Sequence, residues 1–273
     1  MIKHKKSSEN IIDFENIYVS YETSPAPVLE NINLKIDTNE HWVILGANGS
    51  GKSSLIKLIS NDLYPNTKYP FKKKIYGKDI WNVFELKNNL GIITSDLHNC
   101  FEINGKFLTA YQTILSGYYS SIGVFKDQDF TKEQHEKALE VLEFLEILEI
   151  KDKKVYQMST GQLRRCIIGR ALVHNPKAFI LDEPTVGLDI KAQNNFIKFL
   201  QKLSIKASII LVTHHIEEIF PEITHVALMY NKTIFKQGKK ENIVTSKNLS
   251  QVFEININLQ QENNRYYIKS INR

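Results

Sequence analysis

Short runs in which apolar and polar positions alternate dominate the first third of the chain. Residues 11–21 and 28–36 approach the period of two that is typical of half-buried β-strands, and residues 41–45, which contain a continuous apolar run, predict a third short strand. The apolar run at 90–94 predicts a further strand. The segment 61–74, which contains two prolines, is rich in turn-forming residues and predicts loops.

The pattern becomes helical between about 95 and 156. Thr131 and Gln134 have the spacing of a capping box, which marks the start of a helix. Apolar side chains then recur at intervals of three and four residues, as one buried helical face requires. We therefore expect a helical insertion that interrupts an α/β core. The apolar positions of this face are Ala138, Val141, Leu142, Leu145 and Leu148.

Helices and strands alternate again after about residue 157. The polar segment from 241 onward predicts little regular structure beyond a short strand at 266–268. A hairpin turn at Asn231–Lys232 is expected between two short strands. The expected helices are 160–173, 190–203 and one beginning at 217–220, and the expected strands are 177–181, 208–213, 226–230 and 233–236.

The composition is ordinary for a globular protein. Its 273 residues, 42% hydrophobic and 24% charged, allow one large α/β domain or two smaller ones. The net charge of +5 is modest, and we interpret it as a solvated lysine-rich surface. Two cysteines are too few for a disulfide framework, so a reducing, cytosolic compartment fits. No apolar stretch follows the basic residues 1–6, so we expect no secretory signal. The apolar runs are far shorter than the roughly 18 residues that span a membrane, so we expect any membrane role to require a partner.

Residues 46–53 read Gly-Ala-Asn-Gly-Ser-Gly-Lys-Ser and directly follow the apolar run 42–45. This is the phosphate-loop pattern G-x-x-x-x-G-K-[ST] in the strand–loop–helix setting that it needs. Backbone N–H groups of such a turn bind phosphate oxygens, and a helix from about Lys52 adds the positive end of its dipole. Lys52 can reach the β- and γ-phosphates, and the Ser53 hydroxyl can hold Mg²⁺. The loop predicts a nucleotide-binding protein.

A second motif lies far downstream, where the apolar run 178–181 ends in two carboxylates. In phosphate-loop enzymes an Asp at such a strand end completes the Mg²⁺ site, so we assign Asp182 to the metal. The neighbouring Glu183 is suited to orient or deprotonate an attacking water. The alternative interpretation is a solvated Asp-Glu-Pro turn after a core strand, and the phosphate loop makes the functional interpretation the stronger one.

A third motif, Met158-Ser159-Thr160-Gly161-Gln162, precedes this strand. Ser159 and Gln162 have capping-box spacing, which predicts a helix N-terminus and hence an anion site. Ser-x-Gly-Gln upstream of an Asp-Glu-Pro strand resembles the signature of ATP-binding cassette (ABC) ATPases. Residues 187–189 resemble the D-loop of that family, and residues 212–215 resemble its switch-histidine segment, with His214 as the switch. The resemblance runs from about residue 11 to residue 240.

The resemblance implies a phosphate-loop NTPase fold: an α/β core with a mostly parallel sheet, an N-terminal antiparallel β subdomain and a helical insertion. The expected boundaries are 11–94 and 157–240 for the ATPase core, 95–156 for the inserted helical subdomain and 241–273 for a C-terminal extension. It also implies Mg²⁺-dependent ATP hydrolysis by two cassettes packed head to tail. The phosphate loop of one cassette then faces the signature helix of the other.

Residue roles carry over motif by motif. Glu183, His214 and Lys52 are expected to be catalytic, and Ser53, Asp182 and Ser95 to lie at Mg²⁺. Tyr21 stands where the family places an aromatic residue that stacks on adenine, although the nearby Tyr18 is an alternative. The ATP-contacting residues implied are Tyr21, Gly46, Ala47, Asn48, Gly49, Ser50, Gly51, Lys52, Ser53, Ser54, Ser159, Gly161 and Gln162.

Two positions depart from the family pattern. The usual signature is Leu-Ser-Gly-Gly-Gln, and this chain has Met158 and Thr160 at the first and third positions. We expect both to be tolerated. Ser95 stands where the family has a Gln that contacts Mg²⁺ and couples to the membrane partner, which puts the usual coupling geometry in doubt. These features, with Ser116-Gly117 and Ser121-Ile122-Gly123, resemble a molybdenum-type or photorepair-type subgroup.

Two functions remain open at this point. The first is the ATP-hydrolysing subunit of an ABC transporter, peripheral at the cytoplasmic face of the membrane. Its partners would be a second cassette and integral membrane permease subunits, with no nucleic acid. The second is a soluble ABC ATPase in regulation, translation or repair. The single cassette and the lack of long coiled coils favour the transporter. A module that binds nucleotide without hydrolysis is disfavoured, because every hydrolytic motif is present.

Overall fold

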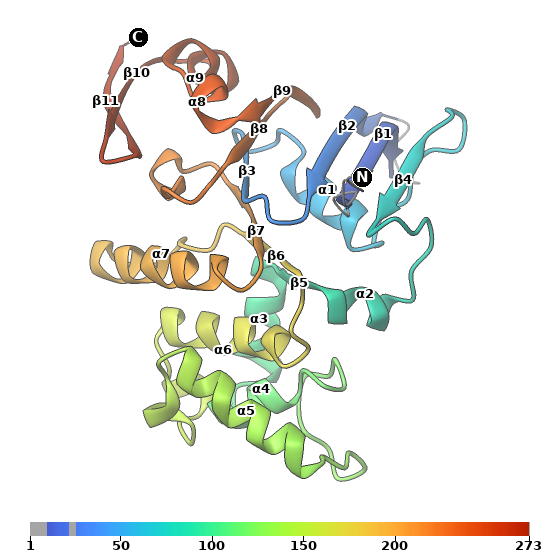
Figure 1. Cartoon of the computed structure of the whole chain (residues 1–273), viewed down its shortest axis with the longest axis vertical. Coiled ribbons are helices and arrows are strands. Elements are labelled where there is room, and N and C mark those ends of the chain that lie inside the picture. The colour runs from blue at the N-terminus through green and yellow to red at the C-terminus, as the bar shows by residue number, and fades with distance from the viewer. Residues whose placement is uncertain (1–9, 22–25, 273) are drawn as a thin grey trace, which may run out of the picture. The chain divides into compact units, whose positions relative to one another are not determined.

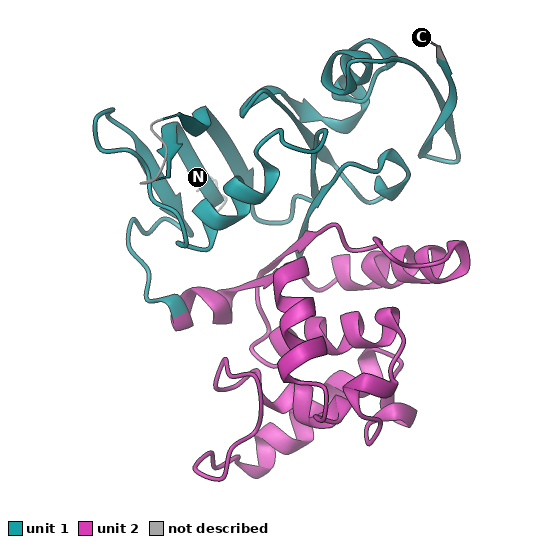
Figure 2. Ribbon diagram, turned by 180° about the vertical axis from the view of Figure 1, so that it is seen from behind, with its two compact units in different colours: residues 1–83, 208–273 teal, residues 84–207 magenta. Residues whose placement is uncertain are grey.

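The structure is a computed structural model that describes residues 10–21 and 26–272. The chain forms two compact units, which Figure 2 colours separately. Unit 1 contains residues 1–83 and 208–273, and unit 2 contains residues 84–207. Each unit is described by itself below. No helix in the described ranges is long and apolar enough to cross a membrane.

An antiparallel sheet forms the N-terminal part of unit 1. Strand β1 (Asn10–Ser20) pairs with β2 (Pro27–Asp37) on one side and with β4 (Lys72–Ile75) on the other. The buried side chains of β1 include Ile12 and Phe14. This is the predicted antiparallel subdomain. Strand β4 overlaps the end of the segment 61–74, which we expected to form loops, and its sequence Lys-Lys-Lys-Ile carries no apolar alternation.

Parallel strands form the rest of the unit 1 framework. Strand β3 (Trp42–Leu45) lies between β7 (Ser208–Thr213) and β8 (His225–Tyr230) and runs parallel to both. All four side chains of β3 are buried, as a central parallel strand requires. The antiparallel strand β9 (Thr233–Lys239) follows β8 through the predicted turn. Both turn residues, Asn231 and Lys232, have positive φ, which fits a type I′ hairpin.

The C-terminal part of unit 1 holds more structure than the sequence indicated. Its elements are α8 (Lys240–Ile243), α9 (Ser246–Phe253) and the hairpin β10 (Asn256–Glu262) and β11 (Arg265–Asn272) (Figure 1). The helix expected from 217 is wrong. Only a 3₁₀ turn, η3 (Ile216–Glu218), forms there, because Pro221 disfavours helical backbone at the residue before it.

Unit 2 is mostly helical around two parallel strands. Strand β5 (Leu90–Ile93) pairs with β6 (Ala178–Asp182), and the helical insertion lies between them in the sequence. The predicted fold class is confirmed, whereas the predicted domain boundaries stay a prediction. The helical elements are α2 (Val83–Asn89), α3 (Ser95–Asn104), α4 (Ala110–Leu115), α5 (Lys132–Phe144), η1 (Leu148–Ile150), η2 (Val155–Gln157), α6 (Thr160–Leu172) and α7 (Ile190–Ser204).

Candidate nucleotide site

The phosphate loop has the expected setting in unit 1. Strand β3 ends at Leu45, and α1 (Lys52–Ile59) begins at the predicted lysine. Gly49 and Gly51 have φ values of 80° and 106°, a left-handed backbone that favours glycine. Gly51 is the N-cap of α1, so this conformation turns the chain from the loop into the helix. The N–H groups of the first helical turn therefore end at the loop, as anion binding requires.

Position 46 requires glycine because there is no space for a side chain there. An ideal Cβ there would lie 2.5 Å from the Met229 carbonyl oxygen and 2.6 Å from Ser50 Oγ. Ser50 itself is buried, and its Oγ has no hydrogen-bond partner among the described residues. A buried hydroxyl without a partner costs free energy, so one in this loop fits a site built for a polar ligand. The loop residues thus fit a bound phosphate.

Lys52 lies at the loop rather than in solvent. Its side chain is only 7% exposed, and Nζ donates hydrogen bonds to the Gly46 oxygen at 2.8 Å and the Ala47 oxygen at 3.2 Å. A buried ammonium needs such acceptors, because desolvation of an unpaired charge is costly. Lys52 therefore presents a fixed positive charge at the loop. Of the other predicted contacts, Asn48, Gly49 and Ser53 are exposed, and Ala47, Gly51 and Ser54 are half-buried.

Two further predicted residues lie in unit 1. His214 directly follows β7, is half-buried, and its ring lies 4.0 Å from that of His215 between centroids. Tyr21 directly follows β1 and is 39% exposed. The alternative aromatic, Tyr18, packs its ring against Tyr69 at 4.4 Å. Tyr18 is thus used in packing, which favours Tyr21 as the side chain that can stack on a base.

The two carboxylates lie in unit 2. Asp182 is the last residue of β6, and Glu183 follows it with φ of 47°. A left-handed backbone is unfavourable for a residue with a long side chain and is tolerated where the surroundings hold it. Glu146 and Glu254 also have positive φ, so this conformation shows a constrained backbone at Glu183, and its catalytic role stays a prediction.

The signature residues begin α6 in unit 2 and form the predicted capping box. Ser159 Oγ accepts a hydrogen bond from the Gln162 N–H at 3.2 Å, and Gln162 Oε1 accepts from the Ser159 N–H at 3.1 Å. Lys153 Nζ also donates to Gln162 Oε1 at 3.0 Å. The Gln162 side chain is therefore turned toward its own segment, where it holds Ser159. Ser159 remains exposed, and its hydroxyl proton can still be donated.

Gly161 has open space around it. An added Cβ would meet only Leu188 Cδ2, at 3.7 Å, among the described residues. This is an ordinary van der Waals distance, so packing within unit 2 does not require glycine here. A ligand or a second molecule that approaches the helix end would require it. The capping geometry and the free space together favour an interaction surface at the start of α6.

Ser95, the other departure from the family pattern, is the first residue of α3 and is exposed. The preceding Thr94 caps this helix, with its side chain accepting from the Leu97 N–H at 3.2 Å. The short Ser95 side chain therefore stands at a helix N-terminus.

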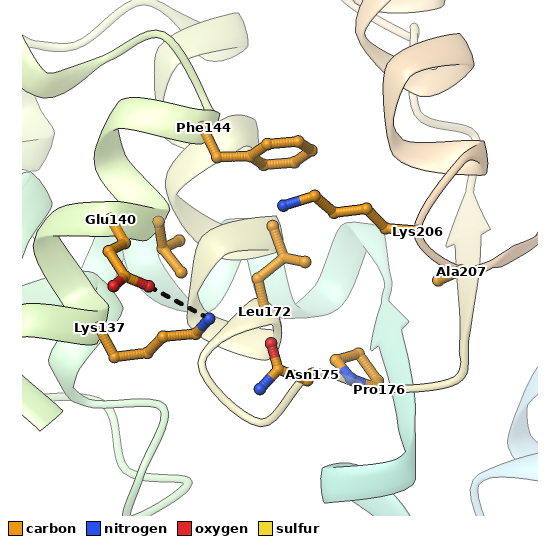
Figure 3. Close-up of a pocket in the computed structure, with 9 residues that line it drawn as sticks. Lys137, Glu140, Phe144, Leu172, Asn175, Pro176, Lys206 and Ala207 are labelled. Carbon is orange, nitrogen blue, oxygen red and sulfur yellow. Dashed lines mark hydrogen bonds and ion pairs between the residues drawn. The ribbon is translucent and has the colours of Figure 1, made fainter. Parts of the chain in front are cut away.

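A separate cavity of about 120 Å³ lies at the other end of α6 (Figure 3). Leu172, Asn175 and Pro176 line it together with α5 residues such as Phe144, and Lys206 Nζ lies 3.8 Å from the Phe144 ring centroid. None of the predicted site residues lines this cavity. It lies at the C-terminal end of α6, whereas the signature begins the helix.

Sequence reasoning did not single out Arg164, although its position in unit 2 links two motifs. The guanidinium is buried and donates hydrogen bonds to the carbonyl oxygens of Pro184 and Val186, which follow Glu183 in the sequence. Two adjacent arginines just inside an apolar helix were the available signal. The partners could not have been inferred, because they are backbone oxygens.

Comparison with known proteins identifies the family. The family model for the ABC transporter matches residues 29–186, more than half of the chain. The chain belongs to the ABC transporter family. It is therefore an ATP-binding protein and an ATPase. It is 29% identical to the uncharacterized ABC transporter ATP-binding protein YlmA of Bacillus subtilis, over 94% of this chain and 96% of YlmA. It is 33% identical to the ABC transporter ATP-binding protein ModF of Escherichia coli, over 80% of this chain and 44% of ModF.

Solved structures agree with this ABC ATPase fold. The ADP conformation of MJ1267, an ATP-binding cassette of an ABC transporter, superposes with a TM-score of 0.78 at 23% identity and covers 90% of this chain and 98% of MJ1267. The structure of cbiO1 from Clostridium perfringens, part of the ABC transporter complex cbiONQ, has a TM-score of 0.73 at 25% identity. It covers 89% of this chain and 94% of cbiO1.

Proposed function

We propose that this ABC ATPase drives transport across a membrane by closing and reopening a dimer of cassettes around two ATP molecules. The observation that carries the proposal is the outward-facing start of α6. It presents an exposed Ser159 hydroxyl and a glycine, Gly161, for which the unit itself has no packing use. Such a surface is suited to a nucleotide held by a second copy. The resemblance of the chain to transporter ATP-binding proteins supports the same assembly.

Each predicted residue then has a chemical role in hydrolysis. Lys52 and the loop N–H groups bind the β- and γ-phosphates, and Tyr21 stacks on the adenine. Glu183 accepts a proton from the attacking water, and His214 interacts with the γ-phosphate. Ser53, Asp182 and Ser95 would hold Mg²⁺, which supplies positive charge at the phosphates. The Ser159 hydroxyl of the second copy donates a hydrogen bond to the γ-phosphate.

The catalytic part of the proposal is tested with Glu183→Gln. This variant keeps the size and hydrogen-bonding capacity of the side chain but cannot accept the proton. We expect ATP turnover to fall by at least about a hundredfold, within the range that general bases contribute. With Mg²⁺ and ATP the variant should accumulate as a dimer of twice the chain mass in sedimentation analysis. A Glu183→Gln protein that is as active as the wild type and stays monomeric would refute this part of the proposal.

A membrane partner is supported by exposed apolar side chains in unit 2. Phe107 and Tyr156 are 66% and 59% exposed, and their rings meet edge to face at 6.1 Å between centroids. The Tyr156 N–H donates to the Lys106 oxygen at 3.1 Å, so the two segments are tied together. Aromatic residues presented on a fixed backbone are typical of protein interfaces. We therefore propose that this pair docks on cytoplasmic loops of a permease subunit, with the cassette at the cytoplasmic membrane face.

The docking proposal is tested by purification of the tagged protein from membranes of its host. We expect an integral membrane protein to co-purify and to be lost with Phe107→Ser and Tyr156→Ser. The matched control is Ile205→Ser, which removes an even more exposed apolar side chain, 86% exposed, elsewhere in unit 2. Recovery of all variants in soluble fractions, with no integral membrane protein bound, would refute it.

A second candidate, a soluble ABC ATPase with a regulatory, translation or repair role, is favoured by one observation. The exposed start of α3 carries Ser95 rather than the longer Gln through which the family couples to its membrane partner. This candidate predicts full ATP turnover and dimerisation without any membrane association. The fractionation experiment therefore distinguishes the two functions.

A further inference from the structure

Arg164 connects the signature helix of unit 2 to the segment that follows Glu183. Its side chain, only 8% exposed, extends from the second turn of α6. Nη1 donates to the Pro184 oxygen, and both Nη1 and Nη2 donate to the Val186 oxygen at 3.2 Å. The planar guanidinium can bind two carbonyl groups at once because its donors form a rigid fork. A single side chain thus fixes two peptide groups of this segment.

The segment held in this way joins two predicted functional elements. Glu183 precedes it with a left-handed backbone, and the D-loop follows it, with Gly187 at φ of 80°. At the far end Asp189 caps α7, its Oδ1 accepting from the Ala192 N–H at 2.8 Å. Thr185 is only 3% exposed and Val186 is 44% exposed, so the segment is held by burial at Thr185 and by the hydrogen bonds that Arg164 donates on either side of it. Arg164 therefore contributes to the position of the segment by fixing its backbone at Pro184 and Val186.

His98 of α3 interacts electrostatically with the Arg164 guanidinium. Its ring is buried, and Nε2 has no hydrogen-bond partner among the described residues. Burial lowers the pKa of His98, and the positive charge of Arg164 lowers it further. Glu102 opposes this lowering of the pKa, as does the backbone of Thr160, which lies close enough to favour the protonated ring slightly. His98 is therefore neutral at pH 7 and does not repel the guanidinium.

We propose that Arg164 is a positioning residue for ATP hydrolysis. It transmits the position of the signature helix to the backbone at Glu183 and the D-loop. When Ser159 and Gly161 engage the nucleotide of a second copy, any displacement of α6 moves the guanidinium and with it the Pro184 and Val186 carbonyl groups. Hydrolysis is thereby linked to engagement of the partner cassette. The inference rests on the proposed roles of Glu183 and of the signature residues.

The neighbouring Arg165 provides a matched control on the same helix. Its Nη1 donates to the Leu145 oxygen at 2.9 Å, and its guanidinium lies 5.3 Å from the Phe199 ring centroid. Arg165 thus stabilises helix packing through contacts that lie away from the segment after Glu183. Loss of Arg165 should lower stability without a selective effect on the chemical step.

The test compares ATP hydrolysis by Arg164→Gln, Arg164→Lys, Arg165→Gln, Glu183→Gln and the wild-type protein, with thermal unfolding of each. For Arg164→Gln we expect kcat to fall about tenfold or more while KM for ATP changes less than about threefold, because the phosphate loop is untouched. Arg164→Lys keeps the charge but has no fork, so it should recover part of kcat. Arg165→Gln should keep kcat within about twofold at a temperature where it is folded.

The outcomes separate the inference from the proposed function. If Glu183→Gln is inactive and Arg164→Gln has wild-type kcat, the positioning role is refuted while the proposed function stands. If Glu183→Gln hydrolyses ATP at the wild-type rate, the role of Glu183 fails and the inference fails with it. Equal kcat losses in Arg164→Gln and Arg165→Gln, in proportion to lost stability, would also refute it. If Arg164→Gln does not fold, the test uses the kcat and KM of Arg164→Lys instead. A wild-type kcat in Arg164→Lys refutes the positioning role, and a reduced kcat with an unchanged KM supports it.

Discussion

A methyl group added at Gly161 should separate folding from function. Gly161 lies in the first turn of α6, and an added Cβ would make one ordinary contact, at 3.7 Å to Leu188 Cδ2. Alanine is favoured over glycine in a helix by up to about 1 kcal/mol. Because nothing in unit 2 opposes the methyl group, we expect Gly161→Ala to raise the free energy of unfolding by about 0.5–1 kcal/mol. For a chain of this size that is a rise in Tm of about 1–3 °C.

The same methyl group should impair ATP hydrolysis. If Gly161 faces a γ-phosphate held by a second copy, the added Cβ occupies the space through which the phosphate approaches the helix N-terminus. We expect kcat to fall about tenfold or more, equivalent to about 1.4 kcal/mol or more of lost transition-state stabilisation. ATP binding to the monomer, which depends on the phosphate loop, should not change. Phosphate release, nucleotide binding and ATP-induced dimerisation are the measurements.

Gly169→Ala is the matched control on the same helix. Its added Cβ would lie 2.5 Å from Leu145 Cδ1 and 3.0 Å from Ile114 Cδ1, so buried side chains must shift. Overpacking of this kind costs about 1–3 kcal/mol, part of which the helix propensity of alanine offsets. Gly169→Ala should therefore be less stable than the wild type and close to it in kcat. A Gly161→Ala protein that is destabilised, or that hydrolyses ATP and dimerises normally, would refute the reasoning.

Three further predictions follow from burial and close packing. Gly46→Ala should weaken ATP binding at least about tenfold, because overpacking against the Met229 oxygen at 2.5 Å must displace the phosphate loop; unchanged affinity by fluorescence titration would contradict this. The Cys166 thiol, whose pKa burial raises to about 12, should stay unmodified by iodoacetamide in the native protein and react once urea unfolds it; rapid native labelling at this position would contradict its burial. Burial also lowers the pKa of three histidines below 6.5, so the unfolded chain takes up protons at a higher pH than the native protein does. The free energy of unfolding should therefore be highest above about pH 7. Below about pH 6.5 it should decrease by up to about 1.4 kcal/mol per pH unit for each histidine. Equal urea midpoints at pH 7.5 and pH 5.5 would argue against this prediction. These histidines are His41, His98 and His174.

Local signals explain which parts of the fold could be predicted from the sequence. The phosphate loop, the start of α1 and the two predicted capping boxes depend on residues within a few positions of one another, and all appear as expected. Strand β4 was missed because it is stabilised by pairing with distant β1, where Lys72 forms ion pairs with Asp13 and Glu15. Its lysine-rich sequence alone gives no strand signal.

The C-terminal elements were missed for a related reason. Polar residues dominate the hairpin β10–β11, and its structure depends on pairing between the two strands and on contact of β11 with η3. Arg164 was missed because its partners are carbonyl oxygens, which every residue carries and which have no sequence signature. Motif residues can be recognised from one sequence, whereas the residues that position them depend on tertiary contacts.

The backbone at Glu183 has a consequence for protein engineering. Eight of the fourteen non-glycine residues with positive φ in the described part of the chain are asparagines, the side chain that tolerates this conformation best. Selection for thermostability alone would favour Asn or Gly at 183 as well, since either relieves the conformational cost. A stability-guided redesign or a consensus built on folding energy would thus tend to remove the proposed general base. Position 183 should be held constant in such work. Any gain in the free energy of unfolding from Asn or Gly at this position measures the stability that the protein gives up to keep Glu183.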